Sequence, residues 1–217
     1  MITTKTIIKT WLPLICLTLS SSFACASTFA DANIMPKIHA FQPLIDDLGN
    51  RFPKSPLSPL IIISTSEQKL YLIENNKVTS SHTISTAEAG LGNQSGSNKT
   101  PLGVHKVAQK FGKGAKAGTI FKARMNTRRV ASILTEPNAR SNQDNVTSRI
   151  LWLDGMEKGI NKGGNVDSRS RYIYIHGTDE EGRLGQPASH GCIRMSNNEV
   201  IDLFEKVPVG TLVDIVE

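Results

Sequence analysis

The heptapeptide Ser189–Met195, with the sequence SHGCIRM, is the stretch around which the rest of the chain is organised. A short way upstream, Tyr174–Thr178 reads YIHGT. A thiol such as that of Cys192 is a weak nucleophile until it loses its proton, and free cysteine has a pKa of about 8.5. A nearby imidazole, here His176, is expected to lower the pKa of the thiol, take its proton and return that proton to a leaving group. The two segments therefore predict a site with Cys192 as nucleophile and His176 as base.

The residues beside this pair predict the rest of the site. Gly191 lets the backbone turn without a Cβ clash, so amides around it can point at a developing oxyanion. The second ring nitrogen of His176 needs an acceptor, and the carbonyl of Gly177 is the nearest in sequence. His190 lies two residues before Cys192, a position that favours shaping the turn over taking the proton.

Two other readings of these residues are open. Arg194 is placed to bind a substrate carboxylate or carbonyl, or else it is an ordinary surface arginine. His176, His190 and Cys192 are all zinc-ligand types, but no second Cys or His falls at the paired spacing of structural zinc sites. The sequence predicts no metal and no other cofactor.

Length and composition favour one β-rich domain. The 217 residues suffice for one domain with extensions and for a sizeable core. Only 6% of residues are aromatic, whereas the 17 Gly and 10 Pro suit strands and turns. The net charge is +6, or +4 once Lys5 and Lys9 are removed with an N-terminal signal. Mild basicity suits an anionic polymer as partner, and no nucleic-acid-binding module is recognisable.

The N-terminus is typical of an export signal. The apolar run Trp11–Leu19 follows a positively charged start and is too short for a permanent membrane anchor. Ala24–Ala26 offers a cleavage site that would leave Ser27 first, with 1–26 as the signal peptide. A retained anchor is disfavoured by the serines that follow the run. Acylation of Cys25 is disfavoured because Ser22 stands where an aliphatic residue is needed.

Removal of the signal peptide would change the number of cysteines in the mature protein. The chain has three, Cys16, Cys25 and Cys192, and only Cys192 lies beyond residue 26. A single thiol in an exported protein cannot form an internal disulfide, which marks it as a reactive group. The alternative is a buried apolar cysteine, which its polar, glycine-containing surroundings oppose.

The spacing of apolar residues and the positions of glycine, proline and capping residues predict the helices, strands and loops. Residues 27–59 form a lead-in, with an amphipathic helix after Pro36 that ends at Gly49 and Asn50, followed by a proline-rich linker. A capping box at Ser196–Glu199 starts a helix just after Cys192. The first amides of this helix are expected to favour a thiolate if the turn brings the sulfur close to them. Residues 90–100, 112–118 and 158–170 are expected to be loops, and 122–148 carries no clear pattern. Strands are predicted at 60–63, 68–73, 78–86, 101–107, 150–153, 171–175 and 211–216.

The run His176–Thr178 with Ser189–Met195 resembles the signature of the YkuD-type L,D-transpeptidases. Thr100–Gly103, TPLG, resembles that family's upstream Thr-Pro-x-Gly element, and the similarity covers about Leu60 to the C-terminus. It implies a mainly β, sandwich-like catalytic domain over 60–217. It also implies exported peptidoglycan chemistry. A cysteine attacks the bond after the third, diamino-acid residue of a stem tetrapeptide, D-alanine leaves, and an amine of another stem resolves the thioester into a 3–3 cross-link.

The same resemblance implies roles for individual residues, and it makes carbapenems expected inhibitors. Two features vary across the family: the short loop Thr178–Ala188, and Arg194 where some branches carry Asn. The implied roles are Cys192 as nucleophile, His176 as base, Gly177 as its orienting carbonyl, amides near His190, Gly191 and Cys192 as oxyanion hole, and Ser189 and Arg194 as substrate-binding residues.

Three alternatives share parts of this reading. The acyl group on Cys192 can pass to water, as in an L,D-carboxypeptidase, or to an amine of an anchored protein. A non-catalytic wall-binding module would keep the fold without needing the cysteine. A secreted cysteine protease is disfavoured because the Cys-Gly-Ser-Cys-Trp pattern of papain-like enzymes is absent.

Overall fold

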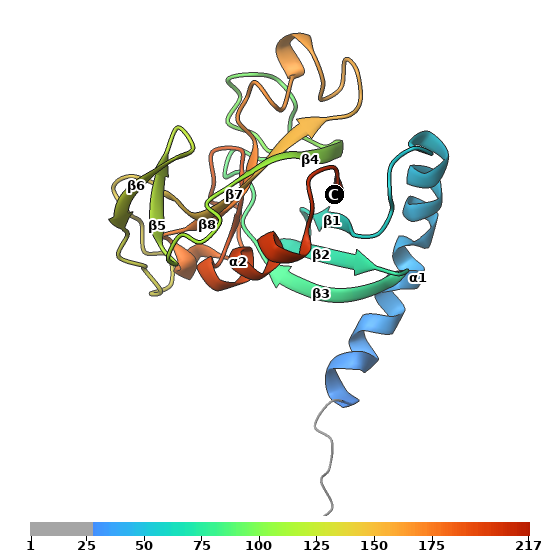
Figure 1. Cartoon of the computed structure of the whole chain (residues 1–217), viewed down its shortest axis with the longest axis horizontal. Helices are drawn as coiled ribbons and strands as arrows, with labels where there is room; N and C mark the ends of the chain where they lie inside the picture. Colours follow the sequence, from blue (N-terminus) through green and yellow to red (C-terminus); the bar gives the residue numbers. More distant parts are fainter. Residues whose placement is uncertain (1–27) are drawn as a thin grey trace, which may run out of the picture.

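The computed structural model describes residues 28–217 as a curled β-sheet with two α-helices (Figure 1). The predicted signal peptide, 1–26, lies outside the described residues. No helix within 28–217 is long and apolar enough to cross a bilayer. The helices are α1 (Thr28–Arg51) and α2 (Asn197–Lys206). The strands are β1 (Leu60–Ser64), β2 (Lys69–Glu74), β3 (Lys77–Thr83), β4 (Gly103–Phe111), β5 (Thr119–Lys122), β6 (Met125–Val130), β7 (Val146–Gly155), β8 (Tyr174–Thr178), β9 (Ile193–Met195) and β10 (Leu212–Val216).

The sheet runs in the order β3-β2-β1-β10-β4-β7 and divides at β7. One branch continues through β5 to β6, and the other through β8 to β9. Most neighbours are antiparallel, but β1 pairs with β10 and β8 with β9 in parallel. The mainly β prediction is confirmed, and this division places β8 and β9 side by side.

Two apolar clusters pack the helices onto the sheet. On one face, α2 packs its buried residues Val200, Leu203 and Phe204 against the inner strands, as its apolar stripe predicts. On the other, Ile45 and Leu48 of α1 pack on β1, β2 and β10. Figure 1 shows α1 lying along that side of the sheet. The lead-in thus buries its apolar stripe on the domain.

Several predicted boundaries agree with the structure and others do not. Asn75 and Asn76 form the predicted β2–β3 turn, with φ of 50° and 57°. The capping box is also confirmed, since the Ser196 side chain accepts from the Glu199 amide. The lead-in helix is longer than expected: it is helical from Thr28, and its glycine stop fails because the chain continues to Arg51.

The strand predicted at 171–175 is displaced. Arg171–Ile173 lies in a turn, with Tyr172 at a φ of 57°, and β8 begins at Tyr174. The Arg171 amide donates to the carbonyl of Asp167, which fixes this turn (3.0 Å). His176 is therefore the middle residue of β8. The sequence had predicted that it follows the end of a strand.

The segment 122–148 contains more structure than its sequence suggests. It holds the end of β5, all of β6 and the start of β7. The β5–β6 turn uses Ala123 and Arg124 at φ of 46° and 68°, so it carries no glycine or asparagine that would predict it. This segment also brings Asp144 to the site described below.

Candidate active site

The parallel pairing of β8 and β9 places the two predicted catalytic residues on one face of adjacent strands. Ile175 pairs with Ile193, and both enter the main core. Because side chains alternate along a strand, Tyr174, His176 and Cys192 belong to the opposite face. Cys192 precedes β9 and lies beside Tyr174, with His176 two residues further along the same face. Two segments 16 residues apart thus meet at one place.

Cys192 is held by the backbone of the neighbouring strand. The amide of Tyr174 donates to Sγ at 3.4 Å, and Sγ lies 3.4 Å from the carbonyl oxygen of Tyr172. The side chain packs against the cluster of Phe121, Ile150 and Tyr174 and is only partly exposed. Burial raises the pKa of the Cys192 thiol to about 11, against the opposing effect of the Tyr174 amide. At neutral pH the resting group is therefore a thiol.

His176 is buried and neutral. Its Nδ1 lies 2.7 Å from the carbonyl oxygen of Gly177, as the sequence predicted. Burial lowers the pKa of His176 to about 4, although this contact opposes the change. The expectation of a thiol already ionised by imidazole therefore fails for the resting site. The two groups instead suit proton transfer that accompanies attack.

A second expectation concerned the amides that begin α2. The Asn197 amide donates to Glu181 Oε1 (2.8 Å), and the Glu199 amide donates to the Ser196 side chain (3.4 Å). Strand β9 also separates these amides from Cys192. The start of α2 is thus engaged locally, and it gives no direct help to a thiolate.

The turn that carries Cys192 is braced from within. Gly191 adopts a φ of 125°, which a side chain would strain, and its carbonyl accepts from Thr100 Oγ1 (3.1 Å). Ser189 Oγ donates to the Cys192 carbonyl (2.6 Å) and accepts from the Gly191 amide (3.2 Å). The buried Ser189 hydroxyl, predicted to bind substrate, is therefore engaged in the turn. Thr100, from the upstream TPLG element, locks the same turn.

These contacts change the predicted oxyanion hole. The Gly191 amide is already used by Ser189, whereas the amides of His190 and Cys192 have no acceptor within residues 28–217. The latter two amides remain as donors for an oxyanion.

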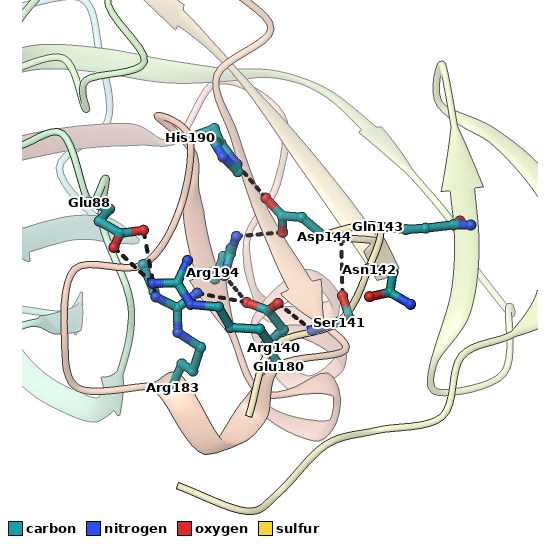
Figure 2. Close-up of a pocket in the computed structure, with 11 residues that line it drawn as sticks. Glu88, Arg140, Ser141, Asn142, Gln143, Asp144, Glu180, Arg183, His190 and Arg194 are labelled. Atoms are coloured by element: carbon teal, nitrogen blue, oxygen red, sulfur yellow. Dashed lines mark hydrogen bonds and ion pairs between the residues drawn. The ribbon is translucent and has the colours of Figure 1, made fainter. Parts of the chain in front are cut away.

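A chain of charged groups runs beside this turn (Figure 2). His190 Nδ1 lies 2.7 Å from Asp144 Oδ2, and the other Asp144 oxygen forms an ion pair with Arg194. Arg194 also donates to Glu180 Oε2 (2.8 Å). Burial would raise the pKa of Asp144, but Arg194 and His190 outweigh it and hold this pKa below its usual range. His190 itself stays largely exposed, with 71% of its side chain accessible.

Arg194 differs from both readings of the sequence. It is 2% exposed, so it is not a surface arginine. Two of its nitrogens pair with Glu180 and Asp144, so it is not free to bind a substrate carboxylate. Its guanidinium instead ties β9 to two loops.

Sequence reasoning missed three residues of the site. Asp144 and Glu180 lie in irregular segments, where no periodicity marks them. Arg171 lies in the turn before β8, and its guanidinium donates to the carbonyls of Asn93 (2.9 Å) and Lys99 (2.6 Å). Arg171 therefore fixes the 90–100 loop beside Cys192. In the sequence Arg171 was visible only as the first residue of the strand predicted at 171–175.

Two cavities flank His190. One, of about 290 Å³, is lined by charged groups that include Glu88, Arg140 and Asp144 (Figure 2). The other, also about 290 Å³, is lined by polar residues such as Ser95 and by Tyr172. No group of three or more potential metal ligands occurs within residues 28–217. Both cavities adjoin the turn at His190, and neither is lined by Cys192 or His176.

Comparison with known proteins identifies a family match and several similar proteins. The model of the YkuD family, the L,D-transpeptidase catalytic domain, matches residues 58–215. The putative L,D-transpeptidase YqjB of Bacillus subtilis is 54% identical over 43 residues, which are 20% of this chain and 24% of that protein. The probable L,D-transpeptidase YbiS of Escherichia coli K12 is 47% identical over 47 residues, which are 22% of this chain and 15% of that protein.

A solved structure gives a more distant similarity. L,D-transpeptidase 3 from Mycobacterium tuberculosis, in complex with a faropenem-derived adduct, aligns with a TM-score of 0.46 at 15% identity. The alignment covers 74% of this chain and 60% of that one. The family match, in contrast, spans the whole sheet from β1 to β10 and the turn that carries the thiol. The chain therefore belongs to the YkuD family of L,D-transpeptidase catalytic domains.

Proposed function

We propose that this chain is an exported peptidoglycan L,D-transpeptidase that uses Cys192 as nucleophile and His176 as base. The observation that supports it most is the placement of both side chains on one face of β8 and β9, in a domain of this family. Export rests on the N-terminal sequence, with its short apolar run and small-residue cleavage site.

The first half-reaction forms a thioester. As Sγ of Cys192 bonds to the carbonyl carbon of the third stem residue, its proton moves to Nε2 of His176. The carbonyl oxygen becomes an oxyanion, for which the amides of His190 and Cys192 are the proposed donors. The C–N bond then breaks, the nitrogen takes the proton from His176, and D-alanine leaves. Each proton and electron pair is accounted for without a cofactor.

The resting protonation states suit this sequence. A thiol with its pKa near 11 and an imidazole with its pKa near 4 stay neutral until substrate arrives. Since Nδ1 of His176 faces a carbonyl, which only accepts, Nδ1 carries the proton and Nε2 carries the lone pair. The ring is thus set in the tautomer that a base requires.

The second half-reaction transfers the acyl group. An amine of another stem gives a 3–3 cross-link, whereas water gives a tripeptide and an amine of an anchored protein gives a protein conjugate. The strained ring of a carbapenem is expected to acylate the same thiol. We favour the stem amine as acceptor.

Incubation with purified tetrapeptide stems tests this function. Mass spectrometry should detect release of D-alanine and cross-linked dimers. Tripeptides alone would indicate hydrolysis, and intact tetrapeptide with no acyl-enzyme would contradict the proposal. Cys192→Ala is the matched control, and it should give none of these products. A casein assay excludes general proteolysis if casein remains uncut.

A further inference from the structure

The stretch of chain between Glu88 and Glu136 carries no acidic residue. Its nine basic residues are Lys99, Lys106, Lys110, Lys113, Lys116, Lys122, Arg124, Arg128 and Arg129. Because the net charge of the whole chain is +6, this one stretch supplies more positive charge than the molecule has in total. The basicity of the protein is therefore concentrated in one part of the chain, a pattern that indicates an anionic partner.

The structure gathers five of these cations at one end of the sheet. They are Lys113 and Lys116 in the loop before β5, and Lys122, Arg128 and Arg129 in the hairpin of β5 and β6. The Ala131 amide, just after β6, donates to the carbonyl of Gly118 (2.9 Å), which ties the loop to the hairpin. Figure 1 shows this hairpin at the end of the molecule opposite α1. Residues 112–130 are called the basic hairpin below.

The fold itself does not use these five charges. All five side chains are exposed, and none forms an ion pair or a side-chain hydrogen bond within the described residues. Arg124, at the turn of the same hairpin, differs from them. It donates to Tyr174 Oη (3.0 Å), and its guanidinium lies 4.6 Å from the centre of the Trp152 ring. One arginine thus holds the basic hairpin on the domain, while five cations face solvent.

The basic hairpin also exposes apolar side chains. Met125 follows the β5–β6 turn, pairs with Lys122 in the strand register and is 73% exposed. Val130, at the other end of β6, is 57% exposed. An apolar side chain among cations suits the interface of a bilayer, where cations meet the headgroups and apolar groups reach the acyl chains.

Protection of a free sheet edge is the ordinary explanation for such charges. Strand β6 ends the sheet, and lysine or arginine on an edge strand opposes pairing with another chain. About one or two charges serve that purpose, and an exposed Met125 works against it. Lys113 and Lys116 lie outside β6, so edge protection leaves them unexplained.

We propose that the basic hairpin docks on an anionic phospholipid surface, with its five free cations at the headgroup phosphates and Met125 in the interface. A soluble polyanion would engage the cations but leave Met125 in water, so a bilayer fits this surface better. The proposal goes beyond the transpeptidase function and does not depend on it. Because Arg124 joins the hairpin to Tyr174, and Cys192 packs against the cluster that contains Tyr174, docking would hold the active site close to the membrane.

Co-sedimentation with lipid vesicles tests this proposal. The protein is purified after export, with the N-terminus that the cell leaves on it. The vesicles contain phosphatidylcholine alone or with about 30% phosphatidylglycerol, at about 0.05 and 0.5 M NaCl. Wild type should bind the anionic vesicles at least about tenfold more tightly than the neutral ones. High salt should weaken that binding at least about tenfold, because it screens exposed charges.

Charge variants assign the binding to the hairpin. Lys122→Gln with Arg128→Gln removes two of its cations and should weaken binding to anionic vesicles about 20-fold. The control, Lys54→Gln with Lys77→Gln, removes the same net charge from exposed positions, and Lys77 lies on β3 at the other end of the sheet order. It should leave binding within about twofold of wild type. An unchanged thermal unfolding midpoint shows that each variant is folded.

Met125→Ser distinguishes a bilayer from a soluble polyanion. It keeps every charge and removes the apolar side chain, so binding to anionic vesicles should fall at least about threefold. Binding to soluble polyphosphate should stay unchanged. The control is Val209→Ser, which removes an apolar side chain that is 59% exposed in the turn after α2. It should change neither binding.

Three results would overturn the proposal. They are equal binding of wild type to neutral and anionic vesicles, a loss in the hairpin double variant no greater than in its control, and vesicle binding that Met125→Ser leaves unchanged. The last result would assign the hairpin to a soluble polyanion instead. None of these measurements reads cross-linking activity, so failure of the proposed transpeptidase function would leave them interpretable.

Discussion

Nδ1 of His176 lies 2.7 Å from the carbonyl oxygen of the next residue, Gly177. Because the carbonyl can only accept, this contact fixes the ring tautomer, with the proton on Nδ1 and the lone pair on Nε2. The backbone carbonyl of the adjacent residue thus orients the His176 ring, so no buried carboxylate is needed for this purpose. The contact depends on where the Gly177 carbonyl points, which makes Gly177 itself testable.

Gly177→Ala should impair acylation. A Cβ at this position would lie 2.9 Å from Asn197 Oδ1 and 2.9 Å from the carbonyl oxygen of Thr147. Neither can yield without moving a strand or a buried amide, so the backbone of β8 should shift. We expect acylation by a carbapenem to slow at least about tenfold, as misplacement of a catalytic group by 1 Å costs more than that. Stopped-flow fluorescence measures the rate, and a wild-type rate would contradict this account of Gly177.

Asn197→Ala should destabilise the domain. The buried Asn197 side chain accepts from Thr147 Oγ1 (2.7 Å) and Ser148 Oγ (2.5 Å), and its amide donates to the Thr178 carbonyl (2.8 Å). Removing it leaves buried hydroxyls and a carbonyl unsatisfied, which lowers the free energy of unfolding by about 2–4 kcal/mol. Urea unfolding monitored by tryptophan fluorescence gives this quantity. Asp202→Ala, on the same helix, is the control and should change it little.

Stability should rise with pH between 4 and 6.5. Burial lowers the pKa of both His105 and His176 to about 4, so the unfolded chain binds two more protons in this range. Burial raises the pKa of Asp214 to about 6, so the folded chain binds one more up to that pH. The difference, 2 − 1 = 1 proton, gives a slope of roughly 1.4 kcal/mol per pH unit.

Two variants test the sign of that slope. His105→Gln removes one histidine, so the slope between pH 4 and 6 should fall to about zero. Asp214→Asn removes the opposing group, so the slope should roughly double. Urea midpoints at pH 4.5, 5.5 and 6.5 provide the comparison. A wild-type slope of the opposite sign would show that these histidines are not buried neutral.

Arg124 should hold the β5–β6 hairpin. Its guanidinium lies 4.6 Å from the centre of the Trp152 ring and donates to Tyr174 Oη (3.0 Å). Arg124→Ala removes both contacts, which together are worth about 1–2 kcal/mol. Amide hydrogen exchange of 119–130 should accelerate about tenfold, while exchange in β1 and β10 stays unchanged. Equal exchange in both proteins would show that the hairpin is held by other contacts.

The sequence predicted much of this molecule because its strongest signals are local. The capping box at Ser196 and the Asn75–Asn76 turn depend on neighbours a few residues away. The Cys192 and His176 pair was recognised from side-chain chemistry. The Gly177 carbonyl was predicted because it is adjacent to the ring that it orients.

Other features depend on contacts that sequence spacing does not reveal. The first three residues of the predicted strand 171–175 lie in a turn instead, where the Arg171 amide bonds to the Asp167 carbonyl and its guanidinium binds carbonyls of a distant loop. Asp144 and His190 are 46 positions apart in the sequence yet in contact, and Arg194 is buried against the same carboxylate. The raised thiol pKa also follows from packing around Cys192, whereas residue types alone suggested a lowered one.

Acylation of the thiol by a carbapenem is the most direct test of the central claim, that Cys192 reacts with the help of His176. Intact-mass measurement over time should show one adduct on wild type, mapped to the peptide containing Cys192. Cys192→Ala should show none, and His176→Ala should react at least about 100-fold more slowly. A His176→Ala protein acylated at the wild-type rate, or an adduct mapped elsewhere, would contradict the claim.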